Sequence, residues 1–357
     1  MAQRSLFRAM ALVASSIAIG AALAATPVGD ALDRPAVMTR RAAQSVLLGA
    51  ASAGERIVAV GERGIVVLSD DNAKSWRQAK VPVGVTLTTV RFADAMHGIA
   101  VGHGGTVLST NDGGESWTRR LDGKRIAQLA LDAAKANGDA ALIKEADRLI
   151  ADGPDKPLLD VLMFDNRRAL VVGAYGLVLA SDNGGETWTP WTSRLDNPKR
   201  LHLYALRSHG STLLIAGEQG LVLRSDDGGA SFKRLTTPYK GSFFTAELPS
   251  DDEIILAGLR GNVWHSTDRG TTWSQVHVPV PVSFTGSALR PDGALVLVNQ
   301  AGVVFSGASG SVAPLNTSPL PPLNGALTRA DGTLLVVSVQ GALSVAPPNS
   351  APATGQK

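Results

Sequence analysis

The 357-residue sequence contains no cysteine. This absence excludes disulfide bridges, thiolate metal sites, thiol nucleophiles and cysteine-linked lipid anchors, so the fold must be held by packing. The sequence also lacks a large excess of charge, with 34 Lys and Arg against 31 Asp and Glu. Two of the arginines fall in a leader that we expect to be removed, which leaves 32 basic residues. A nearly neutral chain is not a general nucleic-acid binder.

Long hydrophobic runs are scarce as well. The clearest one is the acid-free apolar run 9–25, which follows Arg4 and Arg8 and ends in an A-x-A arrangement at Ala22 and Ala24. These are the features of a secretory signal peptide. A transmembrane anchor is the alternative, but the run is alanine-rich and shorter than the roughly 20 residues that cross a bilayer. We therefore expect residues 1–25 to be a cleaved signal peptide and the mature protein to be periplasmic.

The sequence has one repeated pattern in abundance. Five copies are plain: VGERGIVVLSDDNAKSW, VGHGGTVLSTNDGGESW, VGAYGLVLASDNGGETW, AGEQGLVLRSDDGGASF and AGLRGNVWHSTDRGTTW. Two weaker copies, VNQAGVVFSGASG and VSVQGALSV, follow. The second glycine of each copy recurs at intervals of 41, 71, 44, 41, 41 and 39 residues. The long second interval indicates an insertion in a chain of seven repeats.

Each repeat reads as four short alternating strands. A period of about 40 residues with four strands is typical of a propeller blade, because one small sheet cannot bury both faces alone. The sequence therefore predicts an all-β, seven-bladed β-propeller with four-stranded antiparallel blades. Two packed β domains are the alternative, but the period runs on without a linker.

Closure of the ring makes a sharper prediction. The seventh copy ends at Ala346 with three strands, and residues 347–357 have the composition of a disordered tail. We expect residues 35–42, which include Val37, Met38 and Thr39, to supply the missing outer strand of the last blade. The propeller would then span residues 26–346, and both chain ends would share one blade.

The turn between the third and fourth strands is an Asp-box. Its third position is an acceptor that can bond the amides of its own turn, namely Asp71, Asp112, Asn183, Asp227 or Asp268. Its last position is an aromatic residue expected at the blade interface, namely Trp76, Trp117, Trp188, Phe232 or Trp273. Calcium is an alternative, but the bidentate Glu of an EF-hand loop is missing. Five equivalent carboxylate positions favour architecture over a single active site.

These motifs carry a family resemblance. The Asp-box preceded by V-G-x-x-G-x-V-L resembles the bacterial neuraminidase repeat, and residues 45–345 resemble the β-propeller family of photosystem II assembly and stability factors. The resemblance implies a non-enzymatic protein without a cofactor, acting on the lumenal or periplasmic side of a membrane to help membrane-protein complexes assemble. The chain departs from the pattern in its last two boxes, which have decayed, and in its insertion.

Sialidases share the Asp-box, so a glycoside hydrolase or carbohydrate-binding propeller is the alternative. A sialidase needs an arginine cluster, a tyrosine nucleophile and an acidic partner. The three tyrosines, Tyr175, Tyr204 and Tyr239, do not lie in a context that resembles this motif. The six histidines show no metal-ligand spacing. We therefore expect no catalytic, cofactor-binding or metal-binding residues and no small-molecule substrate.

Partner binding is expected on one face of the ring. In a four-stranded blade, the glycine-rich turn between the second and third strands and the connection to the next blade emerge together, opposite the Asp-boxes. The candidate contact residues on this face are Arg63, Tyr175, Arg200, Gln219, Lys240 and Arg260. Basic connection residues are expected there too: Arg119, Arg120, Lys124, Arg125, Lys199, Arg200, His202 and Lys240. They would bind an acidic loop of a membrane protein or anionic headgroups, unless they are only solvated loop charges.

The insertion, residues 121–157, has apolar residues at helical spacing in two segments. Asn137, Gly138 and Asp139 are expected to end one helix and cap the next, and Gly153 to end the second. We predict a helical hairpin between the second and third blades of a monomeric protein. Its apolar stripes either pack on each other and on the propeller rim, or the hairpin is a contact arm for the partner.

Overall fold

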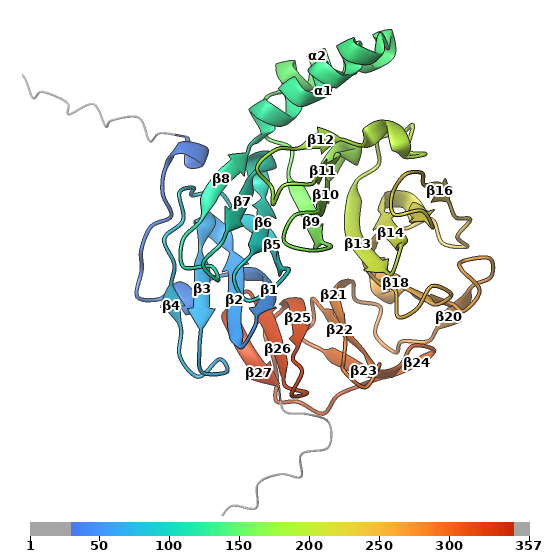
Figure 1. Cartoon of the computed structure of the whole chain (residues 1–357). Coiled ribbons are helices and arrows are strands. Elements are labelled where there is room, and N and C mark those ends of the chain that lie inside the picture. Colours follow the sequence, from blue (N-terminus) through green and yellow to red (C-terminus); the bar gives the residue numbers. More distant parts are fainter. Residues whose placement is uncertain (1–29, 346–357) are drawn as a thin grey trace, which may run out of the picture.

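The computed structural model describes residues 30–345, which form a ring of seven antiparallel sheets around a central axis (Figure 1). Within each sheet the strands follow chain order from the axis to the rim. The predicted seven-bladed β-propeller is therefore confirmed. The signal peptide expected at residues 1–25 and the tail expected at residues 347–357 lie outside the described residues.

Six blades have four strands each, and the seventh has three among the described residues. The first blade consists of β1 Leu47–Ala53, β2 Arg56–Gly61, β3 Val66–Ser69 and β4 Arg77–Gln78. The second consists of β5 Leu87–Phe92, β6 Gly98–Gly102, β7 Val107–Thr110 and β8 Thr118–Leu121. The third consists of β9 Leu158–Met163, β10 Ala169–Gly173, β11 Val178–Ser181 and β12 Thr189–Pro190. The next three are β13 Leu203–His209, β14 Thr212–Gly217, β15 Val222–Ser225 and β16 Lys233–Arg234; β17 Phe243–Glu247, β18 Ile254–Gly258, β19 Val263–Ser266 and β20 Ser274–Val276; β21 Phe284–Leu289, β22 Leu295–Asn299, β23 Val304–Ala308 and β24 Ser311–Pro314. The last is β25 Leu323–Thr328, β26 Leu334–Ser338 and β27 Gly341–Val345.

The core lies between the blades. The second strands, such as β22 and β26, are buried along their whole length because a neighbouring blade covers each face of the sheet. Their continuous runs of Val, Leu and Ile suit this position better than an alternating pattern would. A separate hydrophobic cluster fills each joint between neighbouring blades, including the joint between the seventh and the first.

The prediction for residues 35–42 is wrong. This segment is not a strand; it runs along the outer edge of the first blade, and its last residue, Ala42, packs into the joint between the first and last blades. The Ala36 N–H donates to the Val81 carbonyl at 3.0 Å, and the side chain of Gln78 bonds the backbone of Val37 and Thr39. The physical reason is that this edge already offers partners for the segment's backbone groups, so they need no sheet of the last blade.

The ring closes through side chains and packing. The Asn324 Nδ2 of β25 donates to the Leu47 carbonyl of β1 at 2.8 Å. Arg329, just beyond β25, donates to the Glu55 carbonyl at 3.1 Å. Val337 of β26 is buried in a cluster with Leu47 and other residues of the first blade. Direct contact between the two blades therefore replaces the expected shared strand.

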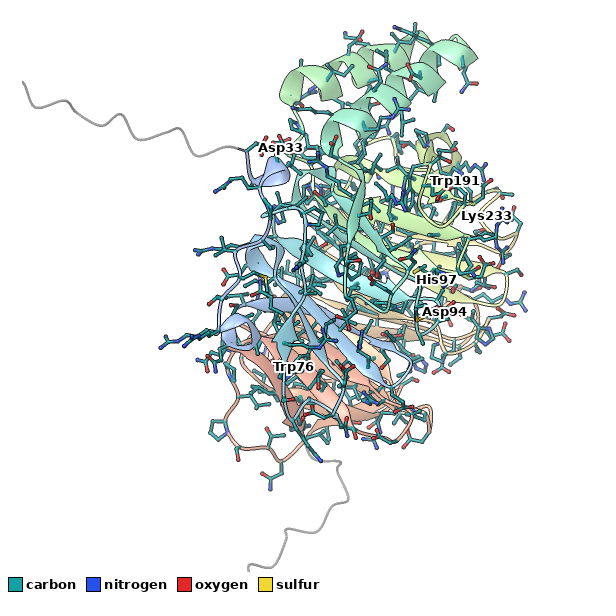
Figure 2. All side chains as sticks on the ribbon, turned by 60° about the vertical axis from the view of Figure 1, so that its left-hand side comes forward. Asp33, Trp76, Asp94, His97, Trp191 and Lys233 are labelled. Carbon is teal, nitrogen blue, oxygen red and sulfur yellow. The ribbon has the colours of Figure 1, made fainter. Side chains whose placement is uncertain are left out.

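The helical hairpin is present where it was predicted. It consists of α1 Gly123–Asn137 and α2 Ala140–Asp152, and it projects from the ring close to Asp33 in the view of Figure 2. Gly138 adopts the left-handed conformation (φ 66°) that ends α1, and the Asp139 carboxylate caps α2. Ile126 of α1 is buried against the second and third blades, whereas Ala146 is the buried residue of α2.

Neither helix of the described region is long and apolar enough to cross a membrane.

Candidate functional site

The Asp-box side chains are used within their own turns. In the fifth blade, one carboxylate oxygen of Asp268 accepts from the Thr272 N–H at 2.9 Å and from the Ser266 hydroxyl at 2.8 Å, and the other from the Thr272 hydroxyl at 2.6 Å. Four boxes share this scheme in full, and in the third blade Asn183 reproduces it with an amide. These bonds, those from Thr272 foremost, lower the pKa of Asp268 to about 2. The hydrogen bonding expected of the boxes is therefore present, and it occupies their acceptors.

The box aromatics lie at the blade interfaces, as predicted. Trp117, Trp188 and Phe232 are buried against the preceding blade, and Trp76 and Trp273 are partly buried in the same position. The fifth box position has a positive φ throughout: Ala73, Gly114, Gly185, Gly229 and Gly270. The boxes therefore have a structural role: they shape the turn after the third strand and pack the joint with the preceding blade.

We call the opposite face the Gly-turn face; it carries the turns at residues 62–64, 103–105, 174–176, 218–220 and 259–261. Four candidate contact residues occupy the same left-handed position in these turns, at φ of 54° to 56°: Arg63, Tyr175, Gln219 and Arg260. The second blade has Gly104 there, the residue that adopts this conformation without strain. The backbone thus presents a different side chain from each turn in one fixed direction.

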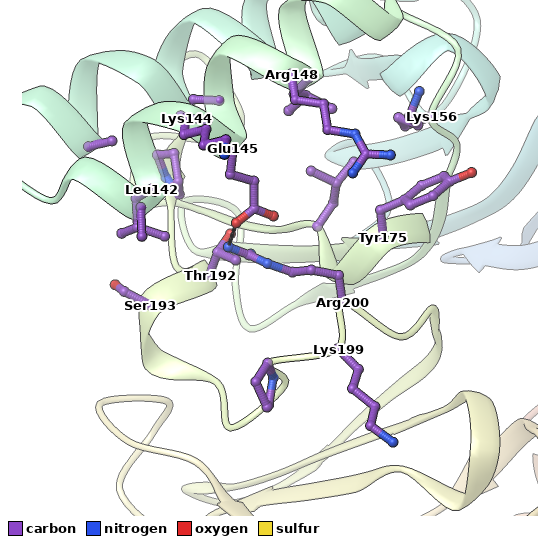
Figure 3. Close-up of a pocket in the computed structure, with 18 of the residues that line it drawn as sticks. Leu142, Lys144, Glu145, Arg148, Lys156, Tyr175, Thr192, Ser193, Lys199 and Arg200 are labelled. Carbon is purple, nitrogen blue, oxygen red and sulfur yellow. Dashed lines mark hydrogen bonds and ion pairs between the residues drawn. The ribbon is translucent and has the colours of Figure 1, made fainter.

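A groove of about 770 Å³ lies on this face between the hairpin and the connection from the third to the fourth blade (Figure 3). Three of the candidate residues, Tyr175, Arg200 and Gln219, line it together. Lys240 lines a smaller pocket of about 200 Å³ that also includes Gln219. Arg63 and Arg260 line neither pocket. The structure therefore brings half of the candidate set to one place.

The loop that carries Arg200 is held in shape by Asn197. The Asn197 side chain is buried; its Oδ1 accepts from the Leu201 N–H at 3.0 Å, and its Nδ2 donates to the Leu201 carbonyl at 2.9 Å. Arg200 itself has φ 52° and donates its N–H to the Asn197 carbonyl. The closed loop fixes the backbone position from which the Arg200 side chain enters the groove.

Tyr175 forms the propeller end of the groove. The residue is 53% exposed, its N–H donates to His202 Nδ1 at 2.9 Å, and the ring meets the His202 ring edge-on. Lys156 Nζ lies 5.2 Å from the centre of the tyrosine ring. Tyr175 therefore faces the groove.

Sequence reasoning missed the hairpin's own contribution. Glu145 of α2 pairs with Arg200 across the groove, and Lys144, Arg148 and Lys156 add charge along the same side (Figure 3). The spacing of Glu145 and Arg148 places both on one helix face, which is a usable signal. Arg200 was a candidate from the sequence, but it lies on a distant loop, and no sequence pattern indicates its pairing with Glu145.

The basic connections do not all gather on the Gly-turn face. Arg120 donates to the Ser109 hydroxyl and lines a pocket of about 260 Å³ beside Asn183, on the Asp-box side. Arg119 bonds the Leu32 carbonyl and Asp33. The expectation is therefore wrong for Arg120, because β8 directs this side chain along the rim and back toward the boxes.

Charged residues also meet at the axis, where a sugar-processing site would lie. Arg207 Nη1 lies 2.7 Å from Asp160 Oδ2, and its Nε lies 3.5 Å from Glu247 Oε1. The cavity there measures about 110 Å³, whereas small-molecule sites occupy roughly 300–1,000 Å³. Burial and the Glu218 carboxylate raise the pKa of nearby Tyr204, the opposite of what a nucleophile needs. The ion pairs of Arg207 with Asp160 and Glu247 thus link the inner strands of neighbouring blades.

Within residues 30–345, no three His, Asp or Glu side chains are grouped so that they could hold a metal ion.

The fold and its corner motifs define an Asp-box β-propeller with an irregular loop face. The model of the family described as photosynthesis system II assembly factor YCF48 matches residues 68–156 and 150–309, which is more than half of the chain. The chain belongs to this family.

Two solved structures support the fold. YCF48 from Cyanidioschyzon merolae is 14% identical with a TM-score of 0.65, covering 89% of this chain and 99% of that one. The WD40 β-propeller domain of Doa1 is 10% identical with a TM-score of 0.61, covering 88% and 95%. A structure described as YCF48 bound to D1 peptide is 22% identical with a TM-score of 0.46; the match covers 54% of this chain and 64% of that one, less than two thirds of its length. No curated protein matches.

Proposed function

We propose that the chain is a non-catalytic assembly factor that acts in the periplasm and binds part of a membrane-protein complex through its Gly-turn face. The observation that carries the proposal is the family match, which runs from the first blade to the sixth. The periplasmic location rests on the signal peptide expected at residues 1–25, and the structure does not describe that segment.

Two features of the site support a binding role. The Asp-box carboxylates and the axial Arg207 already bond groups of their own chain, so these conspicuous polar clusters offer little reacting chemistry. The Gly-turn face, in contrast, presents exposed side chains of varied chemistry on a rigid frame, and loops on rigid scaffolds are where proteins place recognition.

A deletion strain tests the function. Membranes from cells without the chain should contain less of one assembled membrane-protein complex and more of its partial assemblies on native electrophoresis. The wild-type chain should restore assembly, and a variant with Arg63, Arg200 and Arg260 all changed to Glu should not. A matched variant reversed on the Asp-box face, at Lys74, Arg168 and Arg269, should restore it. Unchanged assembly without the chain contradicts the proposal.

Two further results would contradict parts of it. Uncleaved chain found in the cytosolic fraction contradicts the location. Hydrolysis of any member of a sialoside and glucan panel by the purified chain contradicts the non-catalytic role.

A further inference from the structure

We infer that Glu145 occupies the place of a partner's carboxylate on Arg200, and that the groove beneath the hairpin binds an extended acidic peptide segment which displaces it. The inference rests on the proposed function, because it takes the peptide to be a segment of the membrane-protein partner.

The groove is apolar on both walls. Ala133, Ala134 and Leu142 line it from the hairpin, and Leu177 and Leu201 line it from the propeller. Small side chains on the helix wall leave room for the side chains of a second chain. Exposed Tyr175 adds an aromatic surface at one end, and aromatic residues supply much of the energy at protein interfaces.

The rim of the groove favours a negatively charged occupant. Five basic side chains stand against three acidic ones: Lys144, Arg148, Lys156, Lys199 and Arg200 against Glu145, Asp152 and Glu218. Asp152 lies within ion-pair distance of Arg148 and Lys156, Lys156 also pairs with Asp155 beside the groove, and Glu218 accepts from the His202 N–H. Among residues 30–345, Lys144 and Lys199 have no ion-pair partner. The excess positive charge therefore lies on both sides of Arg200, at Lys144 and Lys199.

The contact between Glu145 and Arg200 is suited to exchange. The Arg200 side chain is 26% exposed and that of Glu145 is 43% exposed, so water screens the pair. Pairs of this kind contribute little, up to about a fivefold change in an equilibrium. Arg200 is held by its own loop, whereas Glu145 lies on α2, whose one buried residue is Ala146. A carboxylate from a partner can thus replace Glu145 without a change in the backbone of the loop that carries Arg200.

The test uses the full chain and fluorescent peptides of alternating leucine and glutamate, with leucine–glutamine and leucine–lysine peptides of equal length as controls. Fluorescence anisotropy should show tight binding of the glutamate peptide alone, weakened by salt. Arg200→Gln should weaken it roughly tenfold, the loss expected for one charged hydrogen bond. Glu145→Gln should strengthen it by up to about fivefold, because the internal competitor loses its charge.

Two variants keep the result interpretable. Gln is chosen at position 200 because Gln219 adopts a similar left-handed backbone (φ 54°), so Arg200→Gln should keep the wild-type melting temperature. Arg168→Gln, which removes an exposed arginine from the Asp-box side, should bind like the wild type. Equal binding by wild type and Arg200→Gln, or no gain in Glu145→Gln, overturns the inference.

Other occupants give distinct outcomes. Binding of phosphatidylglycerol vesicles that depends on Arg200, without binding of the glutamate peptide, overturns the peptide assignment. If the deletion strain shows the assembly defect but peptide binding does not depend on Arg200, the inference fails and the proposed function stands. If peptide binding depends on Arg200 but assembly is unchanged without the chain, the proposed function fails instead.

Discussion

At the residue scale, the Asp-box shows why an acidic side chain can recur without doing chemistry. The oxygens of Asp268 accept bonds from Ser266 and Thr272, and none is left pointing at a common site. Asn183 holds the same turn in the third blade, with its Nδ2 donating to the Thr187 hydroxyl at 2.8 Å. The turn therefore requires a side-chain oxygen that accepts these bonds, and it does not require a negative charge.

Asp268 supports a prediction on pH. Its pKa of about 2 in the folded chain lies below the ordinary value of 3.8, so its stabilisation is complete above about pH 4 and is lost as the pH falls toward 2. Asp268→Ala should lower the melting temperature at pH 7, and its difference from the wild type should shrink between pH 4 and pH 2. Thermal unfolding followed by circular dichroism measures both.

Asp268→Asn is the matched control. It should lose less stability than Asp268→Ala at pH 7, because an amide can repeat the contacts of Asn183. A wild-type melting temperature for Asp268→Ala would show that the hydrogen bonds of Asp268 do not stabilise the turn.

At the element scale, the hairpin has two unlike faces. Ile126 of α1 is buried beside the Gly-turn of the second blade, whereas Ile150 of α2 is 45% exposed. The two residues share a side chain and a helical backbone, so they differ chiefly in burial. This contrast separates the docking of the hairpin from its helix propensity.

Ile126→Ala should lower the free energy of unfolding by about 2–4 kcal/mol, because it leaves a cavity between the hairpin and the blades. Ile150→Ala should change it by less than about 0.5 kcal/mol. Denaturant unfolding of both variants checks the pair. Equal losses would mean that α1 is not docked as the structure has it.

Element prediction from the sequence worked where the signal was local. The turn glycines, the caps at Gly138 and Asp139 and the helical periodicity fixed the blades and the hairpin closely. It failed for residues 35–42, whose apolar Val37 and Met38 resembled a strand. Their side chains are exposed, and what holds the segment is Gln78, far along the chain, which no local pattern announces.

At the scale of the whole molecule, the joint between the last and first blades resembles the other joints. Asn324 Nδ2 donates to the Leu47 carbonyl at 2.8 Å, and Thr285 Oγ1 of the sixth blade donates to the Leu323 carbonyl of the seventh at 2.8 Å. Each bond joins an inner strand to the first residue of the next inner strand. The ring therefore closes with the contacts that build it.

Asn324→Ala and Thr285→Ala should each lower the free energy of unfolding by about 1 kcal/mol, the ordinary net value of such a hydrogen bond. Denaturant midpoints at constant slope would measure the two losses. If Asn324→Ala leaves the free energy of unfolding unchanged while Thr285→Ala lowers it, the hydrogen bond at the closing joint does not stabilise the ring.

The candidate site was predictable only in part. The repeated frame singled out Tyr175 and Gln219, because their positions vary while the glycines around them recur. The groove itself depends on bringing α2 over the loop at Arg200, and no periodicity relates those two segments. Arg63 and Arg260 share the turn geometry but stand apart from the groove, since the hairpin covers only one sector of the ring (Figure 1).

The most direct test of the account is photo-crosslinking in intact cells from position 175, in the groove, compared with position 74, exposed on an Asp-box turn. The probe at position 175 should capture a subunit of a membrane-protein complex, Arg200→Gln should reduce this product, and the probe at position 74 should not form it. The same subunit captured equally from both positions, or from position 74 alone, would contradict the account.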